Sequence, residues 1–509
     1  MADLPIHPSA GPAMAPVYQL APRRGRDGLW RFWPDVAQGA PPAVFLAALV
    51  AAVVTAVTEP YAWNGIGGVL TGLAVATAPL AVVLTSRSAR WRLVRPLPIA
   101  AGVATLALVS VGAARAAGWL YALCLLTALG LGSYGLVAGR RWPSVFFGAA
   151  AAPIGLLRGI PWLARGVRRW RLGGAPLRTA GVLVGTALLL LIFGALFASA
   201  DAAFDKVVGA LLPDFKPRLI VRVVMGVLVG CFALGAAFAT RVPPRFDRIG
   251  RGQPRPVRRI DWLLPLGALV LLFATFVGVQ LTVLFGGDEH VLRTAGLTYA
   301  EYARQGFGQL VAVTVLTLGV LAAVARWAPR QSRSDQLLLR LVGGALCLLT
   351  LVIVASALYR LNLYQQAYGF TQLRLLVDAF ELWLGVVFLL ILVAGAALRG
   401  GWLPRVVVAT GVATLLALAA LDPDAFVARQ NLDRYQESHK IDLAYLGYLS
   451  ADAVPVLDRL PEPQRSCALA PIAASLKDPD PWYAYNGSRD RARELLANHP
   501  IHPNPTCAR

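Results

Sequence analysis

The sequence is poor in charged residues. Only 15% of its 509 residues are Asp, Glu, Lys or Arg, whereas 57% are hydrophobic and the mean hydropathy is +0.60. Soluble chains usually carry about 25% charged residues, so this deficit excludes a water-soluble protein built from helices with one polar face. Apolar runs of roughly 20 residues, long enough to cross a membrane, recur along the chain. The composition therefore predicts an all-α fold, a polytopic transmembrane helical bundle.

Histidine and cysteine are also scarce, with five residues of each. The sequence contains no HExxH helix, no CxxC pair and no phosphate-binding Gly-Lys-Ser/Thr loop. The chain therefore lacks the residue patterns that usually bind zinc, haem or the phosphates of a nucleotide. We therefore expect neither a metal ion nor another cofactor.

Acidic residues are outnumbered by basic ones, with 27 Asp and Glu against 48 Lys and Arg and a formal net charge of +21. Such a balance can indicate nucleic-acid binding. Here, however, the arginines collect in alternate connections between apolar segments, near residues 86–95, 139–178, 241–259, 326–340 and 399–405. This is the pattern of cytoplasmic loops. We predict a plasma-membrane protein in contact with membrane lipids, with a cytoplasmic N-terminus and no nucleic-acid partner.

Eleven spanning segments are predicted, at residues 42–58, 63–85, 97–115, 118–138, 178–199, 219–240, 262–285, 307–326, 337–358, 376–398 and 403–421. Together they form a transmembrane domain over residues 42–421. Residues 1–41 are rich in proline and arginine, and we expect a disordered cytoplasmic segment there. An odd number of crossings places the C-terminal tail, residues 422–509, on the extracytoplasmic side.

The connection between the fourth and fifth predicted spans is long and basic. Over residues 142–172, large apolar side chains alternate with arginines in the manner of an amphipathic helix that lies in the membrane interface. The alternative is that residues 144–157 form a further crossing. In that case every later connection would change sides.

The tail has the apolar spacing of short helices, and we predict a small helical subdomain. The expected helices cover residues 424–437, 441–449, 451–460 and 490–497, with Ser450 as a helix N-cap. Asn486-Gly487-Ser488 also matches a glycosylation sequon, although a three-residue match is weak evidence.

The five cysteines fall into two groups. Cys124, Cys231 and Cys347 lie within predicted spans, where a lone thiol behaves as a small apolar residue. Cys467 and Cys507 lie in the tail with no other cysteine between them. Two such cysteines in an oxidising compartment tend to pair, so we predict a disulfide between them; the alternative is two free thiols.

Polar and aromatic residues are concentrated in two of the predicted outer connections. In the one between the seventh and eighth spans, Thr298 can cap a helix and Glu301 can complete a capping box. That helix would place Tyr302 and Arg304 near the lipid headgroups. Glu301, Tyr302 and Arg304 are therefore candidate ligand-binding residues, and the alternative is interfacial anchoring by tyrosine and arginine.

The other such connection leads from the ninth span into the tenth. Arg374, Asp378 and Glu381 follow one another at helical spacing, so the two acids share one face near the outer end of the tenth span. Ionisable side chains at this depth are costly and by default indicate a functional site. Together with Arg360 and Tyr364 they are candidate ligand-binding residues. The alternative is a structural ion pair of the acids with Arg360 or Arg374.

These two connections resemble a known family. Residues 297–306 (LTYAEYARQG) and 358–374 (LYRLNLYQQAYGFTQLR) are similar to blocks of a family of bacterial polytopic membrane proteins that is catalogued as a domain of unknown function. The resemblance runs from about the first span to the tail and is densest over residues 260–460. It implies the class of protein, and it supplies no activity.

We interpret the chain as a protein whose outer face binds an envelope or lipid-linked ligand, as a sensor, scaffold or passage site. One alternative is a membrane-embedded enzyme that acts on a lipid-linked substrate, with candidate acid–base groups Glu59, Asp288, Glu301, Asp378 and Glu381. Another is a secondary transporter that uses Gln280, Asp378 and Glu381. A groove open to lipid would favour the enzyme, a deep central cavity the transporter, and a solid bundle with a polar cap the sensor or scaffold.

Overall fold

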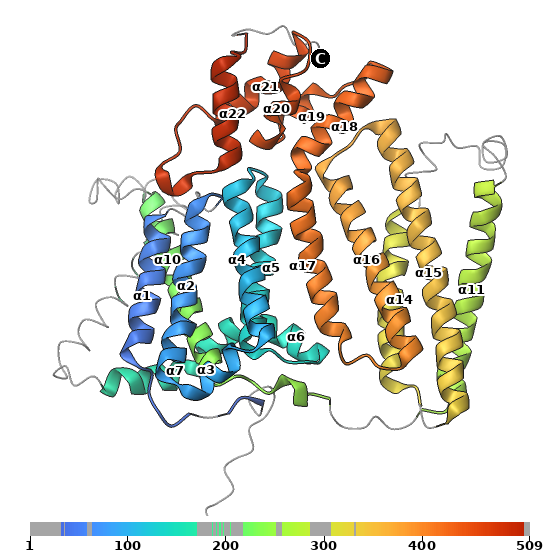
Figure 1. The fold of residues 1–509 in the computed structure, drawn as a ribbon, viewed down its shortest axis with the longest axis horizontal. Coiled ribbons are helices and arrows are strands. Elements are labelled where there is room, and N and C mark those ends of the chain that lie inside the picture. Colours follow the sequence, from blue (N-terminus) through green and yellow to red (C-terminus); the bar gives the residue numbers. More distant parts are fainter. Residues whose placement is uncertain are drawn as a thin grey trace, which may run out of the picture.

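The computed structural model describes residues 32–34, 36–58, 64–169, 217–250, 257–285, 307–329 and 332–502, with a few isolated positions between 186 and 204. Every element in this part of the chain is a helix. Long helices stand side by side, and a cluster of short helices from the tail covers one end of them (Figure 1).

Among the described residues, nine helices are long and apolar enough to cross a membrane. They are α2 (Ile66–Thr85), α4 (Pro96–Ala114), α5 (Gly118–Val137), α10 (Pro217–Arg241), α11 (Arg259–Phe285), α14 (Phe307–Trp327), α15 (Arg333–Tyr368), α16 (Gln372–Ala397) and α17 (Leu403–Leu421). A further apolar helix, α1 (Pro42–Val57), is shorter. These helices coincide with every predicted span except 178–199, which lies mostly outside the described residues. The predicted polytopic all-α bundle is confirmed.

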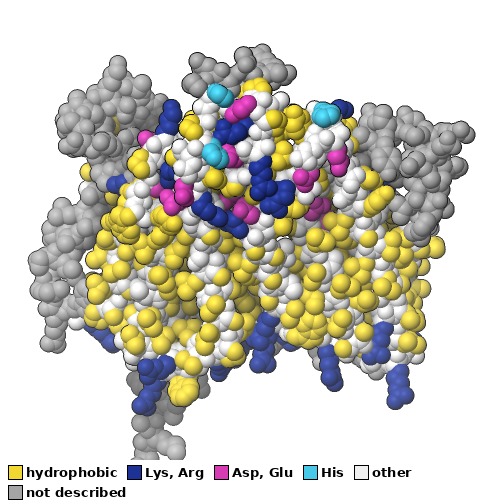
Figure 2. Space-filling model, turned by 45° about the horizontal axis from the view of Figure 1, so that its top comes forward, with side chains coloured by type: hydrophobic (Ala, Val, Ile, Leu, Met, Phe, Trp, Pro, Cys, Tyr) yellow, Lys and Arg dark blue, Asp and Glu magenta, His cyan; other side chains and the backbone are white. Residues whose placement is uncertain are grey.

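The flanks of the bundle carry exposed apolar side chains. Leu84, Leu271 and Leu316, on three different helices, are 70%, 70% and 68% exposed. Figure 2 shows a wide yellow band of such side chains between the two polar ends of the molecule. Water would not tolerate an apolar surface of this extent, whereas lipid tails solvate it. The protein is therefore an integral membrane protein.

The two ends of the bundle differ in charge. The described connections near residues 86–95, 138–142, 242–250, 257–258, 328–329 and 398–402 lie together at the end that we call the arginine-rich end (Figure 1). The tail lies at the opposite end, which we call the tail end, where acidic and basic side chains are mixed (Figure 2). The helices thus alternate in direction in the way that the arginine distribution predicts.

Two helices at the arginine-rich end lie across the long helices rather than along them. α6 (Trp142–Ala149) and α7 (Ala151–Arg169) meet at an angle of 70° and lie along the end of the bundle (Figure 1). Small residues let α7 approach α10 closely: a Cβ at Gly155 would lie 2.7 Å from the carbonyl oxygen of Gly235. This orientation is the one expected of an amphipathic segment in the membrane interface.

The tail is a subdomain of short helices. Its elements are α18 (Pro423–Ser438), α19 (Leu443–Gly447), η4 (Ala451–Ala453), α20 (Val454–Leu457), α21 (Gln464–Ser475), η5 (Trp482–Ala484) and α22 (Gly487–Asn498). Ser450 caps η4, as predicted from the sequence, by accepting a hydrogen bond from the backbone N–H of Asp452. Helix α21 is not among the helices predicted from the sequence, because Pro471 in its interior is typical of a helix break.

Ion pairs connect the later tail elements. Asp480, before η5, accepts hydrogen bonds from Arg489 at 2.8 Å and from Arg493 at 3.0 Å, both in α22. Burial alone would raise the pKa of Asp480, but the hydrogen bonds and charges of Arg493 and Arg489 outweigh it and lower the pKa below its usual value. The charged form of Asp480 therefore stabilises this part of the tail.

Candidate functional site

A tight turn between α15 and α16 positions the candidate residues that the structure describes. α15 ends at Tyr368, and Gly369 turns the chain with a φ of +87°. A Cβ at this position would lie 2.7 Å from Asn431 Oδ1, so both the backbone conformation and the lack of space require glycine. Thr371 then caps α16 by accepting a hydrogen bond from the backbone N–H of Arg374 at 3.3 Å. The turn places the last residues of α15 beside the first of α16.

Arg374 and Tyr364 meet across this turn. The guanidinium carbon of Arg374 lies 4.3 Å from the centre of the Tyr364 ring, and the guanidinium also donates a hydrogen bond to the carbonyl of Gly369. Tyr364 in turn packs against Tyr368, with 4.9 Å between the ring centroids. A cation over an aromatic face is worth about 0.5–2 kcal/mol. In the described part of the chain, Arg374 is thus directed at the aromatic pair and the turn, and it forms no ion pair with Asp378.

The two acids of α16 have different environments. Asp378 Oδ2 accepts a hydrogen bond from Gln365 Nε2 at 2.6 Å. Glu381, one turn further into α16, is 0% exposed, and neither carboxylate oxygen has a hydrogen-bond partner among the described residues. Burial of an isolated carboxylate costs several kcal/mol. Glu381 therefore requires a bound proton or a hydrogen-bond donor that this part of the chain does not supply.

Of the remaining candidate residues, the structure describes only Arg360 and Gln280. Arg360 is a buried residue of α15. Gln280 in α11 accepts a hydrogen bond from Ser356 in α15 at 3.0 Å, so its carbonyl serves a contact between two helices. The other candidates lie outside the described residues: Glu59, Asp288, Glu301, Tyr302 and Arg304.

The tail covers the turn between α15 and α16. Asn431 in α18 donates from Nδ2 to the carbonyl of Phe370 at 2.9 Å and accepts from the backbone N–H of Phe370 at 3.1 Å. Arg434, one turn further along α18, donates to the carbonyls of Gln366 and Ala367 at 2.9 and 2.7 Å. The backbone on both sides of the turn is therefore hydrogen-bonded to α18. A movement of the turn would have to move the tail.

Asp424, at the start of α18, joins three parts of the chain. Its Oδ1 accepts hydrogen bonds from Trp119 Nε1 in α5 at 3.1 Å and from Gln372 Nε2 in α16 at 2.9 Å. Its Oδ2 accepts from the backbone N–H of Ser450 at 2.9 Å. Asp424 is 0% exposed, as Glu381 is, but three donors compensate for its burial.

The tail also holds the loop between α4 and α5. Asp452 Oδ2 accepts from the successive backbone N–H groups of Ala116 and Ala117 at 2.8 and 2.9 Å. Asn486 donates to the carbonyl of Arg115 at 2.8 Å and caps α22 with its side-chain oxygen. Asn486 is 1% exposed, so its side chain is not accessible for glycosylation in the folded protein.

Asp424, Asp452 and Asn486 connect the tail to the bundle, and no pattern in the sequence indicates this role. Each lies at or beside the start of a helix, where a short polar side chain is ordinarily explained by capping alone. Their partners in α5 and in the loop between α4 and α5 are more than 300 residues away in the chain. Only the packing of the tail on the bundle reveals their second role.

The cysteines and the acidic residues provide further tests. Cys124, Cys231 and Cys347 are free thiols, and Cys467 is disulfide-bonded. Cys507, its predicted partner, lies outside the described residues, so the pairing stays a prediction.

Within the described ranges, no group of three or more His, Cys, Asp and Glu side chains could hold a metal ion.

Comparison with known proteins assigns the chain to a family. The model of a family described as a domain of unknown function, DUF4153, matches residues 103–460, from within α4 to the end of the segment after α20. The match includes the turn between α15 and α16 and the part of the tail that covers it. No curated protein and no solved structure matches the chain. The chain belongs to the DUF4153 family of proteins with a domain of unknown function.

Proposed function

We propose that this membrane protein is a receptor or scaffold that binds a lipid-linked or envelope ligand at its tail end. The arginine distribution supports an orientation with the N-terminus in the cytoplasm and the tail on the outer side of the plasma membrane. In this orientation the α15–α16 turn and its tail cover lie where the outer leaflet meets the envelope.

The observation that carries the proposal is that Glu381 is buried and has no hydrogen-bond donor among the residues that the structure describes. An ionisable group in a membrane span is ordinarily paired with a side chain, a backbone group or a substrate. Asp378 nearby and the aromatic pair Tyr364 and Tyr368 at the turn add acceptors and apolar faces. This chemistry suits a ligand that has hydroxyl or ammonium donors next to apolar surfaces, such as the sugar of a lipid-linked saccharide.

The tail supports a receptor or scaffold over the two alternatives. Hydrogen bonds from α18 cover the turn, so the site has a polar cap of the kind expected for ligand sensing.

The test is Glu381→Gln in the full-length protein. Wild-type and variant proteins are purified in a mild detergent, and the lipids that remain bound are identified and quantified by mass spectrometry. Loss of a charged hydrogen-bond acceptor corresponds to about 10- to 150-fold weaker binding. We expect one class of lipid-linked molecule to be retained by the wild type and lost from the variant.

A matched control is Glu437→Gln, because Glu437 is an exposed residue of α18 at the same end. It should retain the wild-type lipids. A neutral amide is cheaper to bury than a carboxylate, so Glu381→Gln should not lower the thermal stability of the empty protein. Equal lipid contents in all three proteins, or loss of folded protein with Glu381→Gln, would refute the proposal.

A further inference from the structure

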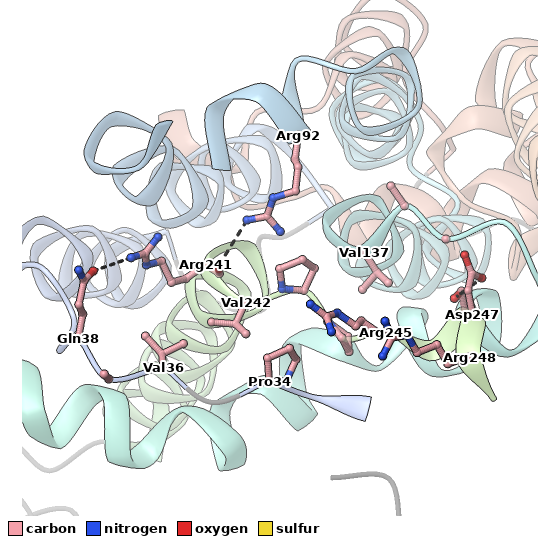
Figure 3. Close-up of a pocket in the computed structure, with 16 residues that line it drawn as sticks. Pro34, Val36, Gln38, Arg92, Val137, Arg241, Val242, Arg245, Asp247 and Arg248 are labelled. Atoms are coloured by element: carbon pink, nitrogen blue, oxygen red, sulfur yellow. Dashed lines mark hydrogen bonds between the residues drawn. The ribbon is translucent and has the colours of Figure 1, made fainter. Parts of the chain in front are cut away.

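A basic cavity opens at the arginine-rich end of the molecule, far from Glu381. It has a volume of about 890 Å³ and lies between the segment before α1, the helix α3 (Arg87–Leu93) and the chain that follows α10 (Figure 3). Four of its lining side chains are arginines and one is an acid: Arg92, Arg241, Arg245, Arg248 and Asp247. The cavity therefore gathers positive charge from two distant parts of the sequence.

Hydrogen bonds to the protein hold two of these arginines in place. Arg92 donates to the backbone carbonyl of Thr240, at the end of α10, at 2.9 Å. Arg241 donates to Gln38 Oε1 at 2.6 Å and to Ser86 Oγ at 2.8 Å. All of these acceptors are neutral groups, so they orient the guanidinium groups without neutralising them. Each guanidinium has five N–H groups, and several remain for a ligand.

The acid in the cavity does not neutralise the arginines. Asp247 accepts hydrogen bonds from the backbone N–H groups of Arg140 and Arg141, at 3.0 Å in each case, and from Ser144 Oγ at 2.7 Å. The carboxylate of Asp247 is therefore held by the two backbone N–H groups that precede α6 and by the hydroxyl of Ser144 in its first turn. Burial raises the pKa of Asp247, but the hydrogen bonds from Ser144, Arg140 and Arg141 outweigh it, so the pKa is lowered. Its charge is directed to the start of that helix.

The positive charges in the cavity repel one another. Burial lowers the pKa of Arg92, and the charges of Arg241 and Arg95 lower it further. Arg245 and Arg248 are exposed, and within the described part of the chain neither takes part in an ion pair. An anion in the cavity would relieve this repulsion.

We infer that the basic cavity binds the phosphate of an anionic lipid headgroup. Guanidinium groups bind phosphate oxygens through paired, charge-assisted hydrogen bonds. The cavity also lies at the level of the membrane surface: α6 runs along this end of the bundle, and its Phe146 is 69% exposed, while Trp91 of α3 is 74% exposed. Aromatic side chains of this kind lie among lipid headgroups. The orientation of the protein in the membrane requires only that arginines lie near the cytoplasmic surface. It does not explain why four of them line one cavity, or why hydrogen bonds hold Arg92 and Arg241 in place there.

The test compares two double variants of the full-length protein in nanodiscs of phosphatidylcholine that contain phosphatidylglycerol. The first is Arg245→Gln with Arg248→Gln, which removes exposed side chains and leaves the hydrogen bonds of Arg92 and Arg241 intact. The control is Arg258→Gln with Arg399→Gln, which removes the same charge from exposed positions at the same end but outside the cavity. Native mass spectrometry counts the phosphatidylglycerol molecules that stay bound.

Loss of one charge-assisted hydrogen bond to a phosphate corresponds to roughly a tenfold loss of affinity. We therefore expect the cavity variant to bind phosphatidylglycerol at least about tenfold more weakly than the wild type. The control, whose arginines lie outside the cavity, should bind it nearly as the wild type does. Inorganic phosphate in the buffer should not displace the lipid. An equal loss in both variants would mean general surface attraction and would overturn the inference. Displacement by inorganic phosphate would also overturn it, because the occupant would then be a soluble phosphate. The test does not involve Glu381, so its outcome is independent of the function proposed above.

Discussion

Removal of the Asp424 side chain should release the tail from the bundle. Asp424→Ala leaves three donors without an acceptor, on Trp119, Gln372 and the backbone of Ser450. A hydrogen bond to a charged group is worth about 1.5–3 kcal/mol, and water can reach donors that are only partly buried, so we take about 1–2 kcal/mol for each. The free energy of tail docking should then fall by about 3–6 kcal/mol. Asp424→Asn keeps one acceptor oxygen and should lose less.

Hydrogen–deuterium exchange in nanodiscs measures this effect residue by residue. In the Asp424→Ala variant, the amides of α18 to α20 should exchange faster, by the factor that corresponds to the lost docking energy, while those inside α15 remain slow. Asp433→Ala is the matched control, because Asp433 is an exposed residue of the same helix. Equal exchange in the two variants would contradict this prediction, because the three hydrogen bonds would then contribute nothing to docking.

Three further outcomes are expected. A membrane-impermeant maleimide should label the variant Tyr448→Cys on intact cells, because this position is 85% exposed in the tail. It should label Arg399→Cys, at the arginine-rich end, only after the cells are opened. The reverse pattern would refute the proposed orientation. Gly369→Ala should lower the midpoint of thermal unfolding by several degrees, because alanine at a positive φ costs about 1–2 kcal/mol and its Cβ would meet Asn431 in α18. The control Gly400→Ala should not lower it, because no atom lies near the Cβ at that position. The pKa of Asp480 is lowered in the folded protein, so its charge stabilises the tail at a pH above its unfolded-state pKa, and this contribution is lost as the pH falls through the folded-state pKa. Hydrogen–deuterium exchange in α22 should therefore increase in acid less steeply for Asp480→Asn than for the wild type.

Parts of the fold follow from the sequence for a simple reason. Lipid requires that every span be a helix with few charges, so the spans are visible as apolar runs, and α2, α4 and α5 begin and end within a few residues of the predicted bounds. The tail lies in water, where helices are short and amphipathic. There Pro471 hid α21, although Ser450 correctly indicated the start of η4.

The contacts within the candidate site could not be predicted from the sequence. Helical spacing placed Asp378 and Glu381 on one face of a span, and both are indeed in α16. Spacing could not show that Gln365 serves Asp378, that Arg374 is directed at Tyr364, or that Glu381 has no partner among the described residues. These are contacts between helices, and they depend on the crossing of α15 and α16.

The sequence by itself determined that this is a polytopic membrane protein whose arginines gather at one end, because the cost of burying charge in lipid acts on every residue locally. Only the tertiary structure decided which polar groups meet. It joined Asp424 to two membrane helices, left Glu381 without a donor in the described part of the chain, and brought Arg92 and Arg241 to one cavity. Hydrogen bonds depend on distance and direction between side chains that are far apart in the chain, and the packing of the helices sets both.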